Sequence, residues 1–264
     1  MSIEILQNHP YGSLSKKYRN AKPFPYLVID DFFDLELAKQ LELEFPDFTS
    51  DYWHSYNNKI EVKKTCNSWN QFTPLVYRVF EALNSVSMLS SLSELCPSLS
   101  EMSADSGLNG GGLHMHAKGG KLNTHLDYSL HPKLGLQRRL NLIVYLNSDW
   151  SENWGGSLGL WGNESSEKPG ELKVTIKPLF NRCVIFDTTQ NSWHGLPDPL
   201  TCPDHQYRKS MAVYYLSEPK PDASKREKAM FSPTKSQEND KSVLELIKLR
   251  SSALTAHKVW KDTK

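Results

Sequence analysis

The segment LNTHLDYSLHP, residues 122–132, contains the pattern that decides the fold and the candidate site. At its centre, His125 and Asp127 are two residues apart. Successive side chains of a β-strand point to opposite faces, so residues two apart share a face. On a strand, this segment therefore presents one imidazole and one carboxylate to the same side. That pairing is suited to holding a single metal ion.

A third ligand has to come from elsewhere in the chain. The segment WHGLPDP supplies His194, 67 residues after Asp127. Two histidines and one carboxylate on one face of an octahedral ion form the facial triad of non-haem Fe(II) oxygenases, which leaves open positions for a chelating cosubstrate and O2. HxD alone is a weak signal, because the chain has nine histidines and His125 can equally be a hydrogen-bonded strand residue.

Arg208 and Ser210 extend the hypothesis. Arg208 follows His194 by 14 residues and opens the strand-like run RKSMAVYYL. Its planar guanidinium can bind the distal carboxylate of a dicarboxylate through two hydrogen bonds, which lysine does less specifically. Ser210 shares a strand face with Arg208 and can add a hydroxyl. The plainer alternative is that Arg208 is a surface charge at the end of a strand.

Tyr145 lies in the run RRLNLIVYLNSDW, in which either strand face can point inward, because a strand buried on both sides is apolar throughout. Tyr145 is therefore either a site residue or an ordinary core residue. The two arginines that open the run, Arg138 and Arg139, are interpreted as a solvated or structural pair.

Seven short runs between residues 107 and 217 have the composition of strands and are separated by glycine-rich or polar turn signals. Evenly spaced short strands predict a double-sheet jelly roll or a barrel. We expect the jelly-roll form, that is, a double-stranded β-helix with a cupin-like core. The expected strands are Leu113–Ala117, Lys121–Tyr128, Leu140–Leu146, Ser157–Trp161, Leu172–Ile176, Cys183–Phe186 and Met211–Leu216, with a turn at Lys168–Gly170.

The chain before this region has a helical pattern. Residues 25–33 predict a strand, and Asp34 is the expected N-cap of a helix that reaches Phe45. A second helical stretch covers 74–95, with a break near Asn84 and Ser85. Helices followed by strands predict an α+β domain with the N-terminal helices packed on one sheet.

The expected domain covers residues 1–217, with a helical part at 34–95 and the jelly-roll core at 107–217. Residues 218–264 are expected to be a polar linker and a C-terminal helix from about 242 to 260. That helix can cover the core or form a homodimer contact.

Composition argues against several classes of protein. The net charge of +1 gives no strong attraction to nucleic acid or to an anionic membrane. No segment approaches the ~18 uninterrupted apolar residues of a membrane span, and the first residues lack the pattern of a signal peptide. Four scattered cysteines without a CxxC pair disfavour a disulfide framework or a thiolate zinc site. We therefore expect a cytoplasmic protein without nucleic-acid or membrane partners.

The ordered set HLD, YLNSDW, GGSLGLW, IKPLFNRCVIFD, WHG and YRKSMAVYYL resembles the prolyl 4-hydroxylase-like branch of the 2-oxoglutarate/Fe(II)-dependent dioxygenases. The resemblance covers about residues 113–216, with a looser similarity in PYLVIDDFFD near the N-terminus. It implies Fe(II) ligands at His125, Asp127 and His194.

The same resemblance implies that Arg208 contacts 2-oxoglutarate, with Tyr145 as its hydroxyl partner. His116 falls near the position where such enzymes commonly have a tyrosine beside the keto-acid end of the cosubstrate. This histidine departs from the family pattern, so His114 and His116 can also be strand residues that share a face.

The activity implied is hydroxylation of an unactivated C–H bond, with Fe(II), 2-oxoglutarate and O2, release of succinate and CO2, and ascorbate as a further candidate cofactor. Asp127 favours hydroxylation over halogenation, because some halogenating relatives lack the carboxylate. The substrate stays open between a peptidyl prolyl or other amino-acid residue and a small metabolite or sugar, since fold and cofactor do not fix it.

Two other classes of protein are alternatives to this family. A zinc hydrolase can use two histidines and an aspartate, but the chain has no HExxH motif and Arg208 would have no role. A non-catalytic cupin-like binding module would keep the fold without turnover, although all three ligands are present.

Overall fold

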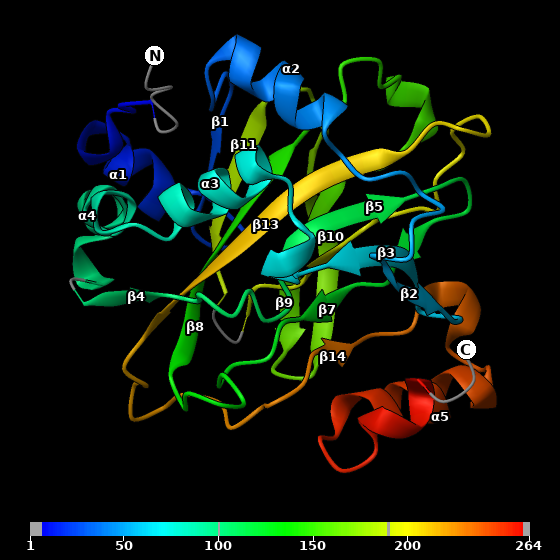
Figure 1. Cartoon of the computed structure of the whole chain (residues 1–264). Helices are drawn as coiled ribbons and strands as arrows, with labels where there is room; N and C mark the ends of the chain where they lie inside the picture. Colours follow the sequence, from blue (N-terminus) through cyan, green and yellow to red (C-terminus); the bar gives the residue numbers. More distant parts are fainter. Residues whose placement is uncertain (1–6, 100, 189–190, 261–264) are drawn as a thin grey trace.

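The protein is described by a computed structural model that covers residues 7–99, 101–188 and 191–260. It has a mixed fold of helices and antiparallel sheets (Figure 1). The helices are α1 (Tyr11–Asn20), α2 (Leu35–Leu43), α3 (Pro74–Leu83), α4 (Val86–Leu95) and α5 (Lys241–Ser251), with short 3-10 helices at Trp69–Gln71, Pro97–Leu99, Glu152–Trp154, Lys235–Gln237 and Ala256–Trp260.

The larger sheet has nine strands within the described residues, and its main path runs in the order β1-β11-β8-β13-β5-β3-β2. Two short strands lie off this path, with β4 paired to β13 and β6 paired to β3. The strands are β1 (Tyr26–Ile29), β2 (His54–Asn57), β3 (Glu61–Cys66), β4 (Met102–Ala104), β5 (Gly112–His116), β6 (Lys121–Leu122), β8 (Gln137–Tyr145), β11 (Arg182–Asp187) and β13 (Arg208–Ser217).

The smaller sheet has five strands in the order β10-β9-β12-β7-β14, again among the described residues. Two of its strands, β7 and β12, carry the two histidines of the candidate metal site. The strands are β7 (His125–Leu126), β9 (Leu158–Ser165), β10 (Lys168–Ile176), β12 (His194–Gly195) and β14 (Met230–Phe231).

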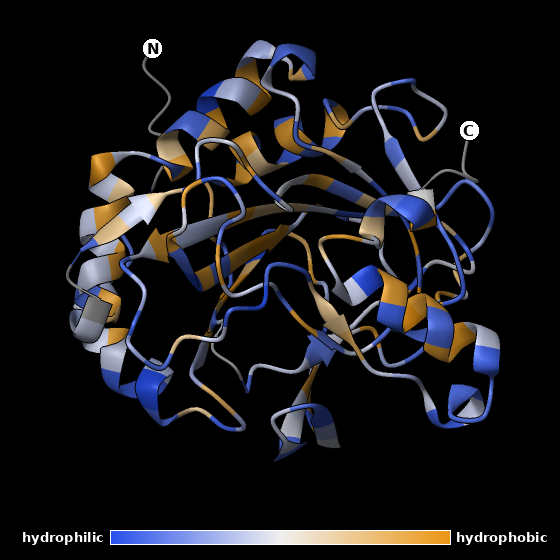
Figure 2. Ribbon diagram, turned by 90° about the horizontal axis from the view of Figure 1, so that it is seen from below, coloured by the Kyte–Doolittle hydropathy of each residue, from blue (hydrophilic) through white to orange (hydrophobic). Residues whose placement is uncertain are grey.

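Strand β8 shows how the core is divided. Leu142 and Val144 belong to the largest apolar cluster, together with residues of α2, α3 and α4 such as Phe80. Tyr145, on the other face, packs in a second cluster that includes Leu158 of the smaller sheet. The helices therefore cover one face of β8, and the other face points toward the second sheet, which places Tyr145 on the inner side. Figure 2 shows the apolar segments concentrated in these strands and in the helices beside them.

The helix boundaries follow capping chemistry. The Asp34 side chain accepts from the backbone N–H groups of Glu36 and Leu37, which confirms the predicted N-cap. The predicted break in the second helical stretch is confirmed between α3 and α4, where Ser85 caps α4 by accepting from the N–H of Met88. Helix α1 was not predicted, because its buried residues include a serine and two tyrosines rather than an aliphatic stripe.

The expected strand at Lys121–Tyr128 is wrong as one element. It divides into β6 and β7, which belong to different sheets, and Asp127 lies just beyond β7. The expected turn at Lys168–Gly170 is also wrong: these residues begin β10, which pairs with β9 through several register shifts. Such bulges allow glycine and proline inside an edge strand.

The C-terminal region is more structured than its composition predicts. The stretch interpreted as polar linker contains β14, which pairs with β7. The helix expected from about 242 to 260 ends at Ser251, because Ser252 is extended, and it continues only as a 3-10 turn. No helix among the described residues is long and apolar enough to cross a membrane.

Candidate active site

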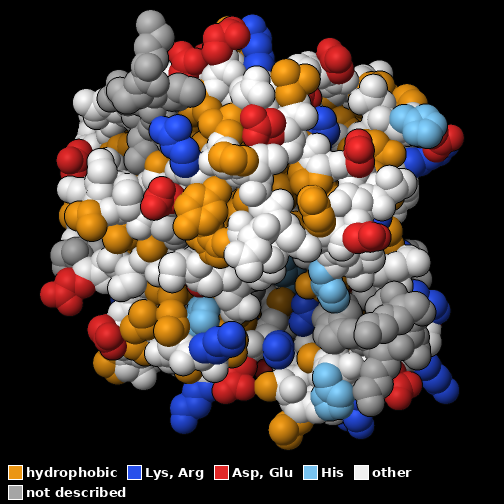
Figure 3. Space-filling view, in the orientation of Figure 1, with side chains coloured by type: hydrophobic (Ala, Val, Ile, Leu, Met, Phe, Trp, Pro, Cys, Tyr) orange, Lys and Arg blue, Asp and Glu red, His pale blue; other side chains and the backbone are white. Residues whose placement is uncertain are grey.

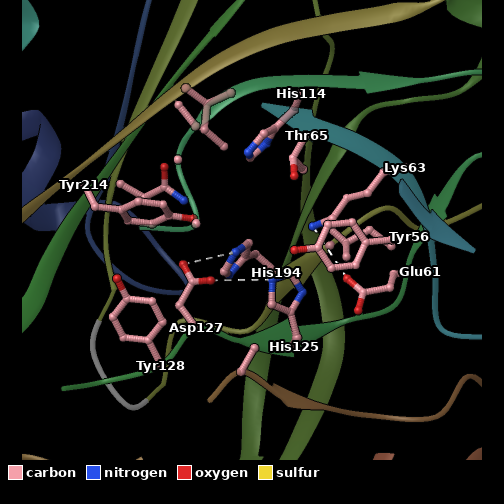
Figure 4. Close-up of a pocket in the computed structure, with 18 of the residues that line it drawn as sticks. Tyr56, Glu61, Lys63, Thr65, His114, His125, Asp127, Tyr128, His194 and Tyr214 are labelled. Carbon is pink, nitrogen blue, oxygen red and sulfur yellow. Dashed lines mark ion pairs between the residues drawn. The ribbon is translucent and has the colours of Figure 1, made fainter. Parts of the chain in front are cut away.

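His125, Asp127 and His194 converge on one point (Figure 4). Antiparallel pairing of β7 with β12 sets His125 directly opposite His194. The Nε2 atoms of His125 and His194 lie 3.7 Å from Asp127 Oδ1 and Oδ2, respectively. One ligand atom from each residue lies within 4.8 Å of the others, and all three side chains are buried. The three residues predicted as a triad are thus brought together in a geometry that can hold one metal ion.

Backbone carbonyls orient both imidazoles. His125 Nδ1 lies 3.0 Å from the carbonyl oxygen of Asn123, and His194 Nδ1 lies 2.8 Å from that of Ser192. A carbonyl only accepts, so each Nδ1 donates and each Nε2 keeps its lone pair for a metal. Burial and the neighbouring His125 lower the pKa of His194 to about 4, so its imidazole is neutral at pH 7. Sequence reasoning missed these partners, because backbone atoms leave no residue-type signal.

Arg138 compensates the buried carboxylate of Asp127. Burial alone would raise the pKa of Asp127, but the Arg138 guanidinium, 3.4 Å away, and the two histidines hold it well below its usual range. The guanidinium carbon of Arg138 lies 3.4 Å and 3.3 Å from the ring centres of Tyr128 and Tyr214. The sequence interpretation of Arg138 as a solvated or structural residue is therefore incomplete: it is buried against the site.

Arg208 lies deep between the sheets, at one end of β13. The register places it opposite His116 on β5, and Ser210 opposite both His114 and Tyr145. Arg208 Nε donates to the carbonyl oxygen of Gly156 at 2.7 Å, and its guanidinium carbon lies 4.8 Å from the Tyr145 ring centre. The surface-charge alternative for Arg208 is wrong, because only 4% of this residue is exposed.

Several buried polar atoms of this region have no hydrogen-bond partner in the described chain. They are His116 Nδ1 and Nε2, Tyr145 Oη, Asn141 Oδ1 and Asp127 Oδ2. Buried polar groups are nearly always satisfied, so such a group of orphaned atoms indicates that a polar ligand belongs between them. Burial, with Arg208 nearby, lowers the pKa of His116 well below its usual value, which leaves a neutral ring able both to donate and to accept.

A cavity of about 450 Å³ connects the triad with Arg208, His116 and Ser210. Its far wall is formed by β2 and β3, from which Tyr56 and Lys63 point toward the triad (Figure 4). Basic and histidine side chains surround the hollow just below the centre of Figure 3. Among the aromatic residues outside the core strands, Tyr56 lines the cavity, whereas Trp53 and Trp69 pack in the helical core and Trp154 packs on Trp150.

Fold and site together resemble those of non-haem iron oxygenases. Residues 111–216 match the model of the 2OG-Fe(II) oxygenase superfamily. The matched segment contains His125, Asp127, His194 and Arg208.

The proteins similar to this chain include prolyl hydroxylases. Prolyl 3-hydroxylase OGFOD1 of Xenopus laevis is 32% identical over 78 residues, which is 30% of this chain but only 15% of that protein. Among solved structures, a Pseudomonas putida prolyl-4-hydroxylase has a TM-score of 0.56 at 13% identity, covering 80% of this chain and 100% of that one. A Trichoplax adhaerens prolyl hydroxylase has a TM-score of 0.56 at 18% identity, covering 78% and 90% of the two chains. At these identities the structures establish similarity of fold alone.

Proposed function

We propose that the protein is an Fe(II)- and 2-oxoglutarate-dependent dioxygenase that hydroxylates an unactivated C–H bond of its substrate. The observation that carries this proposal is one cavity that contains both a His–Asp–His triad and, elsewhere on its wall, orphaned polar groups around Arg208. A dicarboxylate that chelates a metal at one end and meets a guanidinium at the other fits both halves. Neither a zinc hydrolase nor an inert binding module needs the polar groups around Arg208.

We also infer that the core is a double-stranded β-helix. The run β11-β8-β13-β5 in the larger sheet and the run β10-β9-β12-β7 in the smaller sheet give two antiparallel four-stranded units with the cavity between them. The α2 to α4 residues in the same apolar cluster as β8 support packing of the N-terminal helices on the larger sheet. Residues 1–217 would form this domain and 218–264 its C-terminal extension.

In the proposed reaction, His125, Asp127 and His194 hold Fe(II), and Arg208 binds the distal carboxylate of 2-oxoglutarate with Tyr145 and Ser210. His116 supplies a neutral hydrogen-bonding group at the cosubstrate. Bound Fe(II) with 2-oxoglutarate supplies the oxidative chemistry: 2-oxoglutarate and O2 become succinate and CO2, and one oxygen atom enters the substrate C–H bond as hydroxyl. The chain contributes ligand geometry and two imidazoles that backbone carbonyls orient.

For the substrate we propose only a chemical class. The prolyl hydroxylase names of the relatives support a prolyl or other amino-acid residue of a peptide. The alternative is a small metabolite or sugar. Ascorbate is retained as a candidate cofactor.

The direct test is succinate production from 2-oxoglutarate by the purified full chain. We expect succinate to form with Fe(II) in air, and not with Zn(II) or without O2. The Asp127→Ala and His194→Ala proteins should be inactive, because each leaves two ligands. Hydrolysis of ester or peptide probes with Zn(II), together with no succinate under any condition, would favour the hydrolase alternative.

A cytoplasmic location and a homodimer through the C-terminal helix also stay predictions. Four buried, free cysteines support a reducing compartment. Helix α5 contributes Val243, Leu246 and Ile247 to a small core of its own chain and leaves Leu244 exposed; Leu254, after the helix, is also exposed. Sedimentation that finds only monomer at micromolar concentration would contradict the dimer.

A further inference from the structure

The cavity has more positive than negative side chains. Among its described lining residues, Lys63, Arg138, Arg208, Lys228 and Arg250 are cationic, and Glu61, Asp127 and Glu227 are anionic. Arg138 is paired with Asp127, and Arg208 is assigned to the cosubstrate by the proposed function. Glu227 and Lys228 are adjacent in the sequence and opposite in charge. The surplus therefore lies on the wall formed by β3, where Lys63 and Glu61 face the triad (Figure 4).

Lys63 is buried but only loosely paired. It is two residues from Glu61 on β3, so both side chains point into the cavity. Its Nζ lies 3.7 Å from Glu61 Oε2, which is too long for a hydrogen bond, and 5.1 Å from the Tyr56 ring centre. Only 15% of the Lys63 side chain is exposed, and burial lowers the pKa of its ammonium. A buried ammonium gains more from a second anionic partner than an exposed one does.

Helix α5 competes with Lys63 for that carboxylate. Arg250 Nε lies 3.1 Å from Glu61 Oε1, closer than Lys63 lies to Oε2. Glu61 is fully buried. The helix is fixed over this wall by its N-cap, since Lys59 Nζ lies 2.9 Å from Asp240 Oδ2. Arg250 and Lys63 thus share the single negative charge of Glu61, which leaves a net positive charge at this wall for another anion.

We propose that Lys63 binds a carboxylate of the substrate, and that Arg250 acts as a positioning residue by holding Glu61 away from Lys63. This inference rests on the proposed oxygenase function, which it deepens by naming the substrate class. The carboxylate can belong to a free amino acid or to an acidic residue within a peptide. In either case the anion is held at the β3 wall of the cavity, where Lys63 faces the triad.

The test uses binding to the full chain loaded with Fe(II) and 2-oxoglutarate without O2. The probes are the free amino acids, each compared with its primary amide, and acetyl-Gly-Glu-Gly-amide compared with its glutamine counterpart. Calorimetry measures the affinity, and the visible band of the loaded protein reports arrival near the metal. We expect at least one acid to bind at least tenfold more tightly than its amide. The free or the peptide arm that responds identifies the source of the carboxylate.

Two neighbouring lysines give a matched comparison. Lys63→Met should weaken binding of the responding acid at least tenfold, with 2-oxoglutarate affinity unchanged. Lys64→Met should change neither, because Lys64 points to the other face of β3, where its Nζ lies 4.1 Å from the Phe48 ring centre. Arg250→Gln should raise the KM for the acid severalfold while kcat stays unchanged, because Glu61 can then pair more closely with Lys63.

Several outcomes would overturn the inference. They are equal binding of acids and amides, no binding of any probe, unchanged acid binding in Lys63→Met, or a loss of 2-oxoglutarate affinity in that variant, which would place Lys63 in the cosubstrate site. If the loaded protein shows no visible band, the proposed function fails instead. The acid–amide comparison in metal-free wild-type and Lys63→Met protein then decides the role of Lys63 separately.

Discussion

The hydroxyl of Tyr145 is fully buried, and the Arg208 guanidinium is close enough to interact with it. No atom of the described chain makes a hydrogen bond of good geometry to this hydroxyl. An unsatisfied buried hydroxyl costs stability until a ligand arrives. We therefore expect Tyr145→Phe to leave the unliganded protein as stable as the wild type or more stable, while 2-oxoglutarate affinity falls about tenfold. Urea unfolding and calorimetric titration measure the two effects.

Tyr215 is the control for this change. Its hydroxyl donates to the carbonyl oxygen of Leu83 at 2.8 Å, in the helical core and away from the cavity. Tyr215→Phe should lower the free energy of unfolding by about 1 kcal/mol and leave 2-oxoglutarate binding unchanged. A loss of 2-oxoglutarate affinity in Tyr215→Phe but not in Tyr145→Phe would contradict the assignment of Tyr145 to the cosubstrate pocket.

The Arg208→Lys variant tests whether 2-oxoglutarate binding needs the planar shape of the guanidinium in addition to its positive charge. Lysine keeps the positive charge, but it loses both the bond to the Gly156 carbonyl and the planar fork for a carboxylate. We expect the affinity for 2-oxoglutarate to fall about tenfold or more, with Fe(II) affinity retained. Arg182→Lys, which alters a partly exposed pair with Asp30, should have no effect on either affinity. Unchanged 2-oxoglutarate binding in Arg208→Lys would remove this residue from the site.

At the residue scale, the sequence predicts what depends on residue type and spacing. The two-residue interval between His125 and Asp127 and the ordered positions of His194 and Arg208 are visible in one dimension. Arg138 is not, because its place between Tyr128 and Tyr214 depends on the packing of three separate segments. Lys63 is hidden for the same reason: only the fold brings β3 over the triad.

At the scale of elements, the junction of β3 and β5 depends on one glycine. Gly112 has a φ of +93°, and a Cβ there would lie 2.1 Å from the carbonyl oxygen of Cys66. Gly112→Ala should therefore separate the two strands and destabilise the protein by more than about 3 kcal/mol. Gly119 has a φ of +75° but open space around it, so Gly119→Ala should cost only about 1 kcal/mol. Equal costs in chemical unfolding would contradict the close approach.

Helix ends, which depend on local capping, could be predicted from the sequence. Strands that depend on pairing with distant segments could not. Capping residues such as Asp34 and Ser85 act within one turn, so helix ends could be predicted. The division of 121–128 between two sheets depends on partners distant in sequence, since β6 pairs with β3 and β7 pairs with β12 and β14. The strand β14 lies in a polar stretch and exists through its pairing with β7.

At the scale of the whole molecule, segments far apart in the chain enclose one cavity. The triad comes from the smaller sheet, the Arg208 pocket from the larger sheet, and the Lys63 wall from β3 with α5 behind it. The expected arrangement of helices before strands describes the chain order only in part, because β1, β2 and β3 precede α3 and α4. It does not foresee that the C-terminal helix returns to the N-terminal strands beside the site.

A spectroscopic titration tests whether Fe(II) and 2-oxoglutarate bind together at the triad. The metal-free full chain is titrated anaerobically with Fe(II) and then with 2-oxoglutarate while the visible spectrum is recorded. The account predicts a metal-to-ligand charge-transfer band that requires both additions, is absent in Asp127→Ala, and in Arg208→Lys needs a higher concentration of 2-oxoglutarate. A wild-type protein that binds Fe(II) but develops no band with 2-oxoglutarate would contradict the account.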